Sequence, residues 1–205
     1  MKALKRFKTM AMSILFIVVG PNLSMAQKKC SLLFLNYQNV ENYFHTIILP
    51  ELRADDGIPI PDFKAIKKLR TVGSNNDGIF SAQLNGRKVF LKSMRVPSHY
   101  SPNRFFKEAA WTKVLSDLGM GPQFYGIARD LETNVHLIVT EFVDARKFDI
   151  YTAPNLSKEQ INTYRAAVSD LAYIGIRPVD IQFYFTSNGG VRFFDPGYYE
   201  WHRPF

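Results

Sequence analysis

The dipeptide Asn85-Gly86 restricts the fold of this chain more than any other feature of its 205 residues. It separates two runs rich in apolar residues, Ile79–Leu84 and Lys88–Met94. Asn-Gly is a strong signal for a two-residue hairpin turn, because both of its positions adopt a positive φ in that turn. The two runs are therefore predicted to pair as antiparallel strands, and the fold must accommodate this hairpin.

Strands and helices follow one another on both sides of the hairpin. One helix is predicted from the cap at Ser101-Pro102 to Gly119, and a second from the capping box Ser157–Gln160 to Gly175. The apolar segment Ser31–Pro50 has no pattern that assigns it. The order is three strands, helix, two strands, helix and hairpin, which indicates an α+β fold. The predicted strands are Ala65–Val72, Ile79–Leu84, Lys88–Met94, Gln123–Arg129, His136–Val143, Phe183–Thr186 and Val191–Phe194.

Residues 1–26 have the three-part layout of a secretory signal peptide. Met1–Lys8 is basic, Thr9–Gly20 is apolar and uncharged, and the segment ends in small residues before a cleavage site expected after Ala26. As a helix the apolar run would reach about 18 Å, against a hydrocarbon core of roughly 30 Å, so no stable membrane anchor is expected. A second interpretation is that Met25 is the true first residue.

The composition excludes several classes of function. Half of the net charge of +8 lies in residues 1–26, and no basic cluster in the rest alternates with aromatic residues, so no nucleic-acid partner is expected. Cys30 is the only cysteine, which excludes an internal disulfide. The histidines are too far apart in sequence for a short-spaced zinc-ligand set. They are His45, His99, His136 and His202.

Four short motifs and one glutamate lie at definite places within or between the predicted elements. Gly73-Ser74-Asn75-Asn76-Asp77-Gly78 separates the first two strands, and Val89-Phe90-Leu91-Lys92 lies in the third. Glu108 falls in the middle of the first helix, Gly175-Ile176-Arg177-Pro178-Val179-Asp180 follows the second, and Phe194-Asp195-Pro196-Gly197 ends the hairpin. Each motif alone also fits an ordinary turn or a solvated charge. Their value lies in their order.

That order, with these motifs, resembles the protein kinase superfamily over about Ala65–Gly197, two-thirds of the chain. The resemblance implies a minimal protein-kinase-like α+β fold. Its N-lobe would be a five-stranded sheet with the helix that the family calls αC, and its C-lobe would be strongly truncated. Residues 65–205 are then the kinase-like domain, and residues 27–64 are an N-terminal extension.

The resemblance also implies an ATP site. Backbone N–H groups around Gly73, Asn75 and Gly78 would lie over the phosphates, where a Cβ would obstruct close approach. Lys92 would hold the α- and β-phosphates, and Glu108 would orient that lysine through an ion pair. In the predicted strand that leads to the hinge, backbone groups from Glu141 to Val143 would meet the edge of the adenine.

Three further residues are implied for catalysis and Mg²⁺ binding. Asp180 corresponds to the base that accepts the proton of the substrate hydroxyl, and Asp195 to the principal Mg²⁺ ligand. Counting back from Asp195, Gln182 stands where the family has its metal-binding asparagine. Carboxylate and amide oxygens are the hard ligands that Mg²⁺ prefers.

The chain departs from the family pattern at several of these positions. Pro178 and Val179 replace the usual histidine and arginine, Pro196 replaces the usual phenylalanine, and Phe90 replaces a small residue above the adenine. The segment from Asp180 to Gln182 is also shorter than usual. These departures leave open a second hypothesis, a pseudokinase that binds a partner and transfers nothing.

The short catalytic loop and the early end of the chain are similar to the HopBF family of secreted bacterial effector kinases. This resemblance implies an ATP- and Mg²⁺-dependent serine/threonine kinase that phosphorylates the eukaryotic chaperone HSP90 on a serine in the host cytosol. The protein is expected to be a monomer. The signal-like segment 1–26 leaves a third reading open, in which the protein resides in the periplasm.

Overall fold

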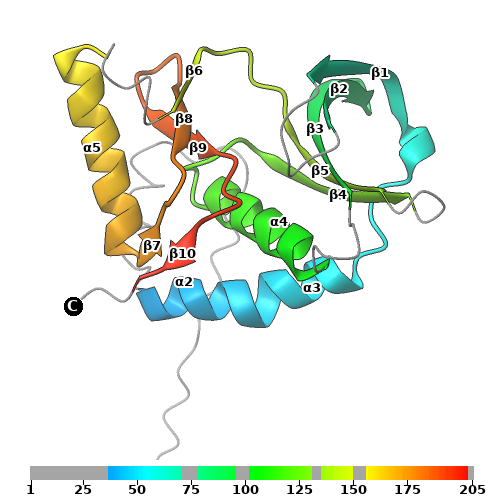
Figure 1. Ribbon diagram of the computed structural model, residues 1–205, viewed down its shortest axis with the longest axis horizontal. Coiled ribbons are helices and arrows are strands. Elements are labelled where there is room, and N and C mark those ends of the chain that lie inside the picture. Colours follow the sequence, from blue (N-terminus) through cyan, green and yellow to red (C-terminus); the bar gives the residue numbers. More distant parts are fainter. Residues whose placement is uncertain (1–36, 71–77, 96–101, 131–134, 150–155, 203–205) are drawn as a thin grey trace, which may run out of the picture.

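The computed structural model describes residues 37–70, 78–95, 102–130, 135–149 and 156–202, and in it the exposed Asn85-Gly86 turn joins β2 to β3, the central strand of the main sheet (Figure 1). Asn85 has a φ of 52° and Gly86 a φ of 75°, and Leu84 pairs directly with Arg87 across the turn. Two consecutive positive φ angles define the type I′ turn that matches the twist of the flanking strands. The predicted hairpin is confirmed.

The hairpin belongs to a five-stranded antiparallel sheet with the order β1-β2-β3-β5-β4. This confirms an α+β fold with five strands where the sequence predicted them. β1 begins two residues before its predicted start, and β5 ends two residues before its predicted end. The strands are β1 (Phe63–Arg70), β2 (Gly78–Leu84), β3 (Arg87–Arg95), β4 (Phe124–Asp130) and β5 (Val135–Glu141).

The helix α4 (Pro102–Asp117) crosses the middle of the molecule (Figure 1). Side chains on several sides of this helix are buried. They are Phe105, Phe106, Ala109, Ala110, Trp111, Val114 and Leu115. The helix is therefore enclosed by packing elements, and it holds its side chains in fixed positions.

A helical segment before the sheet, in the region that the sequence left unassigned, covers α4 from below in Figure 1. It consists of α2 (Tyr37–Tyr43), the π-helical η1 (Phe44–Ile48) and α3 (Leu49–Ala54), and a short 3-10 turn η2 (Ile60–Asp62) follows it. The side chains at every fourth position are buried in the core around α4. Since four residues exceed one α-helical turn of 3.6, the wider π-helical turns help keep them on one face. They are Val40, Phe44, Ile48 and Leu52.

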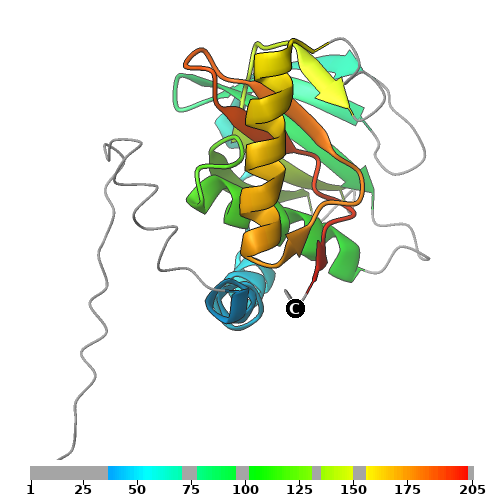
Figure 2. The ribbon, with the colours of Figure 1, turned by 90° about the vertical axis from the view of Figure 1, so that its left-hand side faces the viewer.

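The remaining elements form a smaller part on the other side of α4. The predicted hairpin is present as β8 (Gln182–Phe185) and β9 (Val191–Phe194), and β6 (Lys147–Asp149) adds a third strand to it. Figure 2 shows the helix α5 (Lys158–Tyr173) in front of this sheet. The two-residue strands β7 (Ile176–Arg177) and β10 (Glu200–Trp201) pair with each other.

Helix α5 begins as its sequence predicted. The Ser157 hydroxyl accepts a hydrogen bond from the Gln160 backbone N–H at 3.2 Å, and the Gln160 side-chain oxygen accepts one from the Ser157 N–H at 3.0 Å. This reciprocal pair is a complete capping box. Gly175, with a φ of 77°, follows the last turn and confirms the predicted end of the helix.

Several predictions fall outside the described residues. These are the signal peptide 1–26, Cys30, the cap residue Ser101, and the positions Gly73 and Asn75 of the predicted phosphate loop. In the part of the chain that the structure describes, no helix has the length and apolar character needed to cross a membrane.

Candidate active site

A pocket opens between the five-stranded sheet, helix α4 and the β8–β9 hairpin. Six residues that the sequence singled out line it together, from five different parts of the chain. They are Lys92, Glu108, Glu141, Val143, Gln182 and Asp195. Other lining residues are Ile79, Phe90, Thr140, Lys147, Tyr184 and Phe194.

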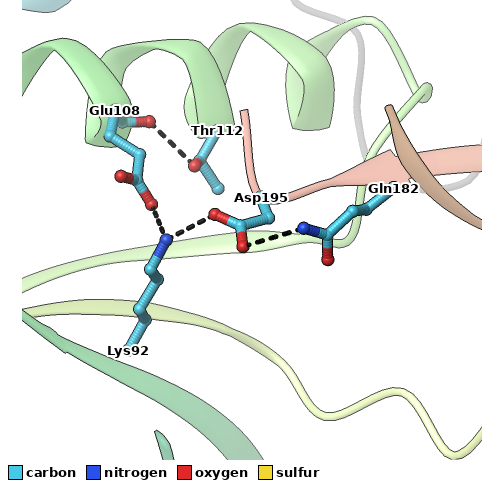
Figure 3. Close-up of polar contacts among 5 residues, drawn as sticks. All are labelled: Lys92, Glu108, Thr112, Gln182 and Asp195. Atoms are coloured by element: carbon cyan, nitrogen blue, oxygen red, sulfur yellow. Dashed lines mark hydrogen bonds and ion pairs between the residues drawn. The ribbon is translucent and has the colours of Figure 1, made fainter. Parts of the chain in front are cut away.

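Lys92 is the centre of the polar contacts in this pocket (Figure 3). Its Nζ lies 2.5 Å from Glu108 Oε1 and also contacts Asp195 Oδ1. The Lys92 side chain is 13% exposed and that of Glu108 is 4% exposed. Residues 92, 108 and 195 are thus joined by a largely buried ion pair network, although they come from β3, α4 and the end of β9.

The register of β3 explains why Lys92 points into the pocket. Successive side chains of a strand alternate between its two faces. Val89 and Leu91 are buried in the apolar core on one face of the sheet, so Phe90 and Lys92 face the pocket on the other. In the ladder with β5, Phe90 is opposite Thr140 and Lys92 is opposite Ile138.

The turn Asp195-Pro196-Gly197 brings its carboxylate to Lys92 through an unusual backbone conformation. Asp195 has a φ of 55°, in the left-handed region where aspartate is better tolerated than most non-glycine residues. A Cβ on Gly197 would lie 2.9 Å from Glu108 Oε2, closer than side-chain contacts allow. The glycine therefore lets this turn pack directly against α4.

The charges of the network shift one another's proton affinity. Burial by itself would lower the pKa of Lys92, but the carboxylates of Glu108 and Asp195 outweigh burial and raise it. Burial raises the pKa of Glu108, while the charge of Lys92 opposes that shift. The lysine is therefore held firmly in its charged form at neutral pH.

Gln182 contacts the second carboxylate oxygen of Asp195, whereas Asp180 lies outside the pocket lining. The Gln182 amide Nε2 donates to Asp195 Oδ2 at 3.4 Å (Figure 3). Asp180 lies in a bend between β7 and β8, half-buried, and does not line the pocket. Burial raises the pKa of the Tyr199 hydroxyl, and the charges of Tyr164, Asp195 and Asp180 raise it further.

Glu141 and Val143 mark the opposite end of the pocket. The Glu141 backbone N–H donates to the Gln123 carbonyl at 2.8 Å, and its carboxylate lies 3.4 Å from Arg192. Val143 follows in the irregular segment that connects β5 to β6.

Gly78 lies at the start of β2, opposite Ser93, outside the pocket lining.

The structure also brings residues into the site that the sequence did not indicate. Lys147 reaches the pocket from β6, whose three residues are too few to show a periodic pattern. Tyr199 lies outside the pocket lining, fully buried beside Trp111, with ring centroids 6.3 Å apart.

No protein-family model matches the chain, and a comparison with curated proteins finds no match.

Proposed function

We propose that this protein is an ATP-dependent serine/threonine protein kinase with a minimal protein-kinase-like fold. The observation that carries the proposal is the contact of Lys92 with both Glu108 and Asp195 inside one pocket. A lysine paired with a helical glutamate, next to an aspartate that can bind metal, is the arrangement by which protein kinases hold Mg²⁺-ATP.

The surrounding fold supports the same proposal. The sheet order β1-β2-β3-β5-β4 places the lysine strand in the middle, and α4 presents Glu108 to it. The smaller part, with β8–β9 and α5, supplies Asp195 and Gln182 from the opposite wall. In this proposal the five-stranded sheet is the N-lobe, and the smaller part is a strongly truncated C-lobe.

The donor set fits a magnesium ion that is bound together with phosphates. Among the described residues there is no group of three or more histidine, cysteine or acidic side chains that could hold a metal by itself. Mg²⁺ needs only one or two protein carboxylates when phosphate oxygens complete its shell. Asp195 would supply a carboxylate, and Gln182 an amide oxygen once its amide turns over. Bound there, the ion would neutralise charge on the phosphates.

The residues of this chain would divide the remaining work. Lys92 would hold the phosphates, because its position is fixed by Glu108 and its charge is kept at neutral pH. Asp180 would orient the hydroxyl of a serine or threonine and accept its proton as the oxygen bonds to the γ-phosphorus. The bond from that phosphorus to ADP breaks in the same transfer, and ADP leaves with the electron pair.

The test is phosphate transfer from labelled ATP with Mg²⁺ to purified eukaryotic HSP90, run with the full chain and with Asp195→Ala. We expect label on HSP90 with the wild type and a loss of more than a hundredfold with the variant. Asp170→Asn is the matched control, because Asp170 is exposed on α5 and does not line the pocket. Comparable activity in Asp195→Ala would refute the assignment of the site.

The choice of substrate rests on the resemblance to the HopBF effector kinases. Label on the protein itself but not on HSP90 would retain the kinase and remove that substrate. N-terminal sequencing of the exported protein would separate a host-directed effector from a periplasmic protein. Cleavage after Ala26 would favour the periplasm, and an intact Met1–Ala26 segment would exclude a cleaved signal peptide.

A second candidate is a pseudokinase that acts as a binding module. One observation favours it: both oxygens of the Asp195 carboxylate already contact protein groups, Lys92 on one side and Gln182 on the other. The departures from the kinase sequence pattern also favour a pseudokinase. They are Pro178, Pro196 and Phe90. ATP binding without any transfer of label would support this candidate.

A further inference from the structure

Lys147 spans the pocket between its two walls. Its Nζ lies 4.9 Å from the centroid of the Phe90 ring on β3 and 5.1 Å from the centroid of the Phe194 ring on β9. β6 pairs with β8, with Lys147 opposite Tyr184, so this lysine is anchored in the smaller part and reaches across to the five-stranded sheet. All three side chains line the pocket.

The two rings hold the ammonium by cation–π attraction, which acts within about 6 Å of a ring centroid. Aromatic rings also pack against other rings at centroid distances of about 4.5–7 Å. The Lys147 ammonium therefore lies where a flat heterocycle would lie if it packed against the rings of Phe90 and Phe194. An ammonium and a nucleobase cannot both fill this space.

The position of Phe90 indicates which part of a bound nucleotide would lie between Phe90 and Phe194. Phe90 lies opposite Thr140 in the sheet, next to Glu141, whereas Lys92 lies two residues further along β3 with Glu108 and Asp195. Two residues of a strand span about 7 Å. The charged end of the pocket suits phosphates, and the Phe90 end suits the base.

We propose that a purine base binds between Phe90 and Phe194 by displacing the side chain of Lys147. Lys147 thereby sets the affinity of the base site, since a ligand must stack on the rings better than the ammonium does. This inference rests on the proposed nucleotide site and adds to it the competition of Lys147 and the contact with Phe194.

The test is isothermal titration calorimetry with adenosine, which has no phosphate and needs no metal. Lys147→Ala removes the competing ammonium, so we expect adenosine to bind about three- to tenfold more tightly than to the wild type. Lys147→Arg is the matched control, because it keeps a cation that stacks on aromatic rings, so this variant should bind adenosine no more tightly than the wild type does. Circular dichroism checks that all variants are folded.

A double-mutant cycle with Phe90→Leu shows whether the competition involves the ring. Leucine keeps an apolar side chain of similar reach but removes the π system. We expect Lys147→Ala to increase adenosine affinity less in the Phe90→Leu background than in the wild type. An equal gain in both backgrounds would overturn the role of Phe90.

Two other results would overturn the inference. Adenosine affinity that is unchanged or weaker in Lys147→Ala would show that the ammonium does not compete with the base. A loss of ADP affinity without a change for adenosine would instead assign Lys147 to the phosphates. These outcomes are distinguishable from failure of the proposed function, because adenosine binding requires no transfer, and label on HSP90 would report transfer whichever residues contact the base.

Discussion

At the scale of single residues, the charge balance of the site depends on Lys92, because this one lysine contacts two carboxylates. Glu108 and Asp195 together carry one more charge than the lysine neutralises. The Glu108 side chain is 4% exposed, so its negative charge in the folded protein depends on the neighbouring positive charge of Lys92. Removing the lysine would leave a carboxylate without its cation in a low-dielectric environment.

Lys92→Met should therefore make the stability of the protein depend on pH. Without Lys92, burial raises the pKa of Glu108 further above its unfolded value of about 4.3. A raised carboxyl pKa contributes stability that is present below the unfolded pKa and is lost as the pH rises through the folded pKa. We expect a loss of about 3 kcal/mol at pH 7 and a smaller loss near pH 4, measured by urea unfolding at each pH.

The control for this prediction is the double variant Lys92→Met/Glu108→Gln. Glutamine cannot titrate, so the extra pH dependence of the single variant should disappear. A single variant whose stability, relative to wild type, is the same at pH 4 and pH 7 would contradict the role of Glu108.

Gly197 provides a second prediction at this scale. A Cβ at this position would lie 2.9 Å from Glu108 Oε2, so Gly197→Ala must move either the turn or the glutamate. We expect the rate of phosphate transfer to fall by at least tenfold, because the contact between Lys92 and Glu108 is disturbed. The unfolding free energy should fall by only about 1–2 kcal/mol. Wild-type activity in Gly197→Ala would show that this close contact is not needed.

Helix α4 depends on the segment from α2 to α3 for its position. Phe44 is fully buried between Trp111 of α4 and Trp201 of β10, with ring centroids 4.6 Å and 5.5 Å away. Tyr43 donates a hydrogen bond to Asp117 at the end of α4. The segment therefore joins α4, which carries Glu108, to the C-terminal strand.

Phe44→Ala should destabilise the protein by about 3–5 kcal/mol, since it removes a large side chain from a packed aromatic cluster. Urea unfolding measures this change. Ile47→Ala in the same segment is the matched control, because Ile47 is 40% exposed, and it should cost under about 1 kcal/mol. Equal effects of the two variants would mean that this segment does not support α4 through Phe44.

The pocket lies between two walls that belong to different parts of the molecule. β3 and β5 form one wall, β8 and β9 form the other, and α4 connects them. A ligand that contacts both walls binds the folded chain and not the unfolded one. Its binding must therefore stabilise the whole molecule.

Under the proposed function Mg²⁺-ATP is such a ligand, so it should raise the melting temperature. At a concentration one hundred times the dissociation constant the stabilisation is about 2.7 kcal/mol, which corresponds to roughly 5–10 °C for a protein of this size. Differential scanning fluorimetry measures the shift. Asp195→Ala should show less than half of it, and a full shift in that variant would place the nucleotide outside this site.

Much of the architecture was predictable because its signals are local. The positive φ angles at Asn85 and Gly86 and the reciprocal hydrogen bonds of Ser157 and Gln160 involve only neighbouring residues. The five strands of the sheet and the helices α4 and α5 followed from periodicity and these boundaries. Lys92, Glu108, Gln182 and Asp195 were identified by motif order, and the structure brings all four into one pocket.

Other features were decided by contacts between distant parts of the chain. The strands β6, β7 and β10 have two or three residues each, and they exist because partner strands satisfy their backbone groups. The sequence left Ser31–Pro50 unassigned, and packing against α4 decides which face of this segment is buried, with Val40, Phe44, Ile48 and Leu52 in the core.

The sequence by itself determined the order of the elements, the turn and cap at their boundaries, and the identity of the charged residues. Tertiary structure alone decided that Glu108 would lose its water, that α4 would be enclosed, and that Lys147 would lie between Phe90 and Phe194. Hydrogen bonds within turns and caps act over a few residues and can be read from the chain. Burial and cation–π contacts depend on which distant surfaces meet, and only the folded molecule determines that.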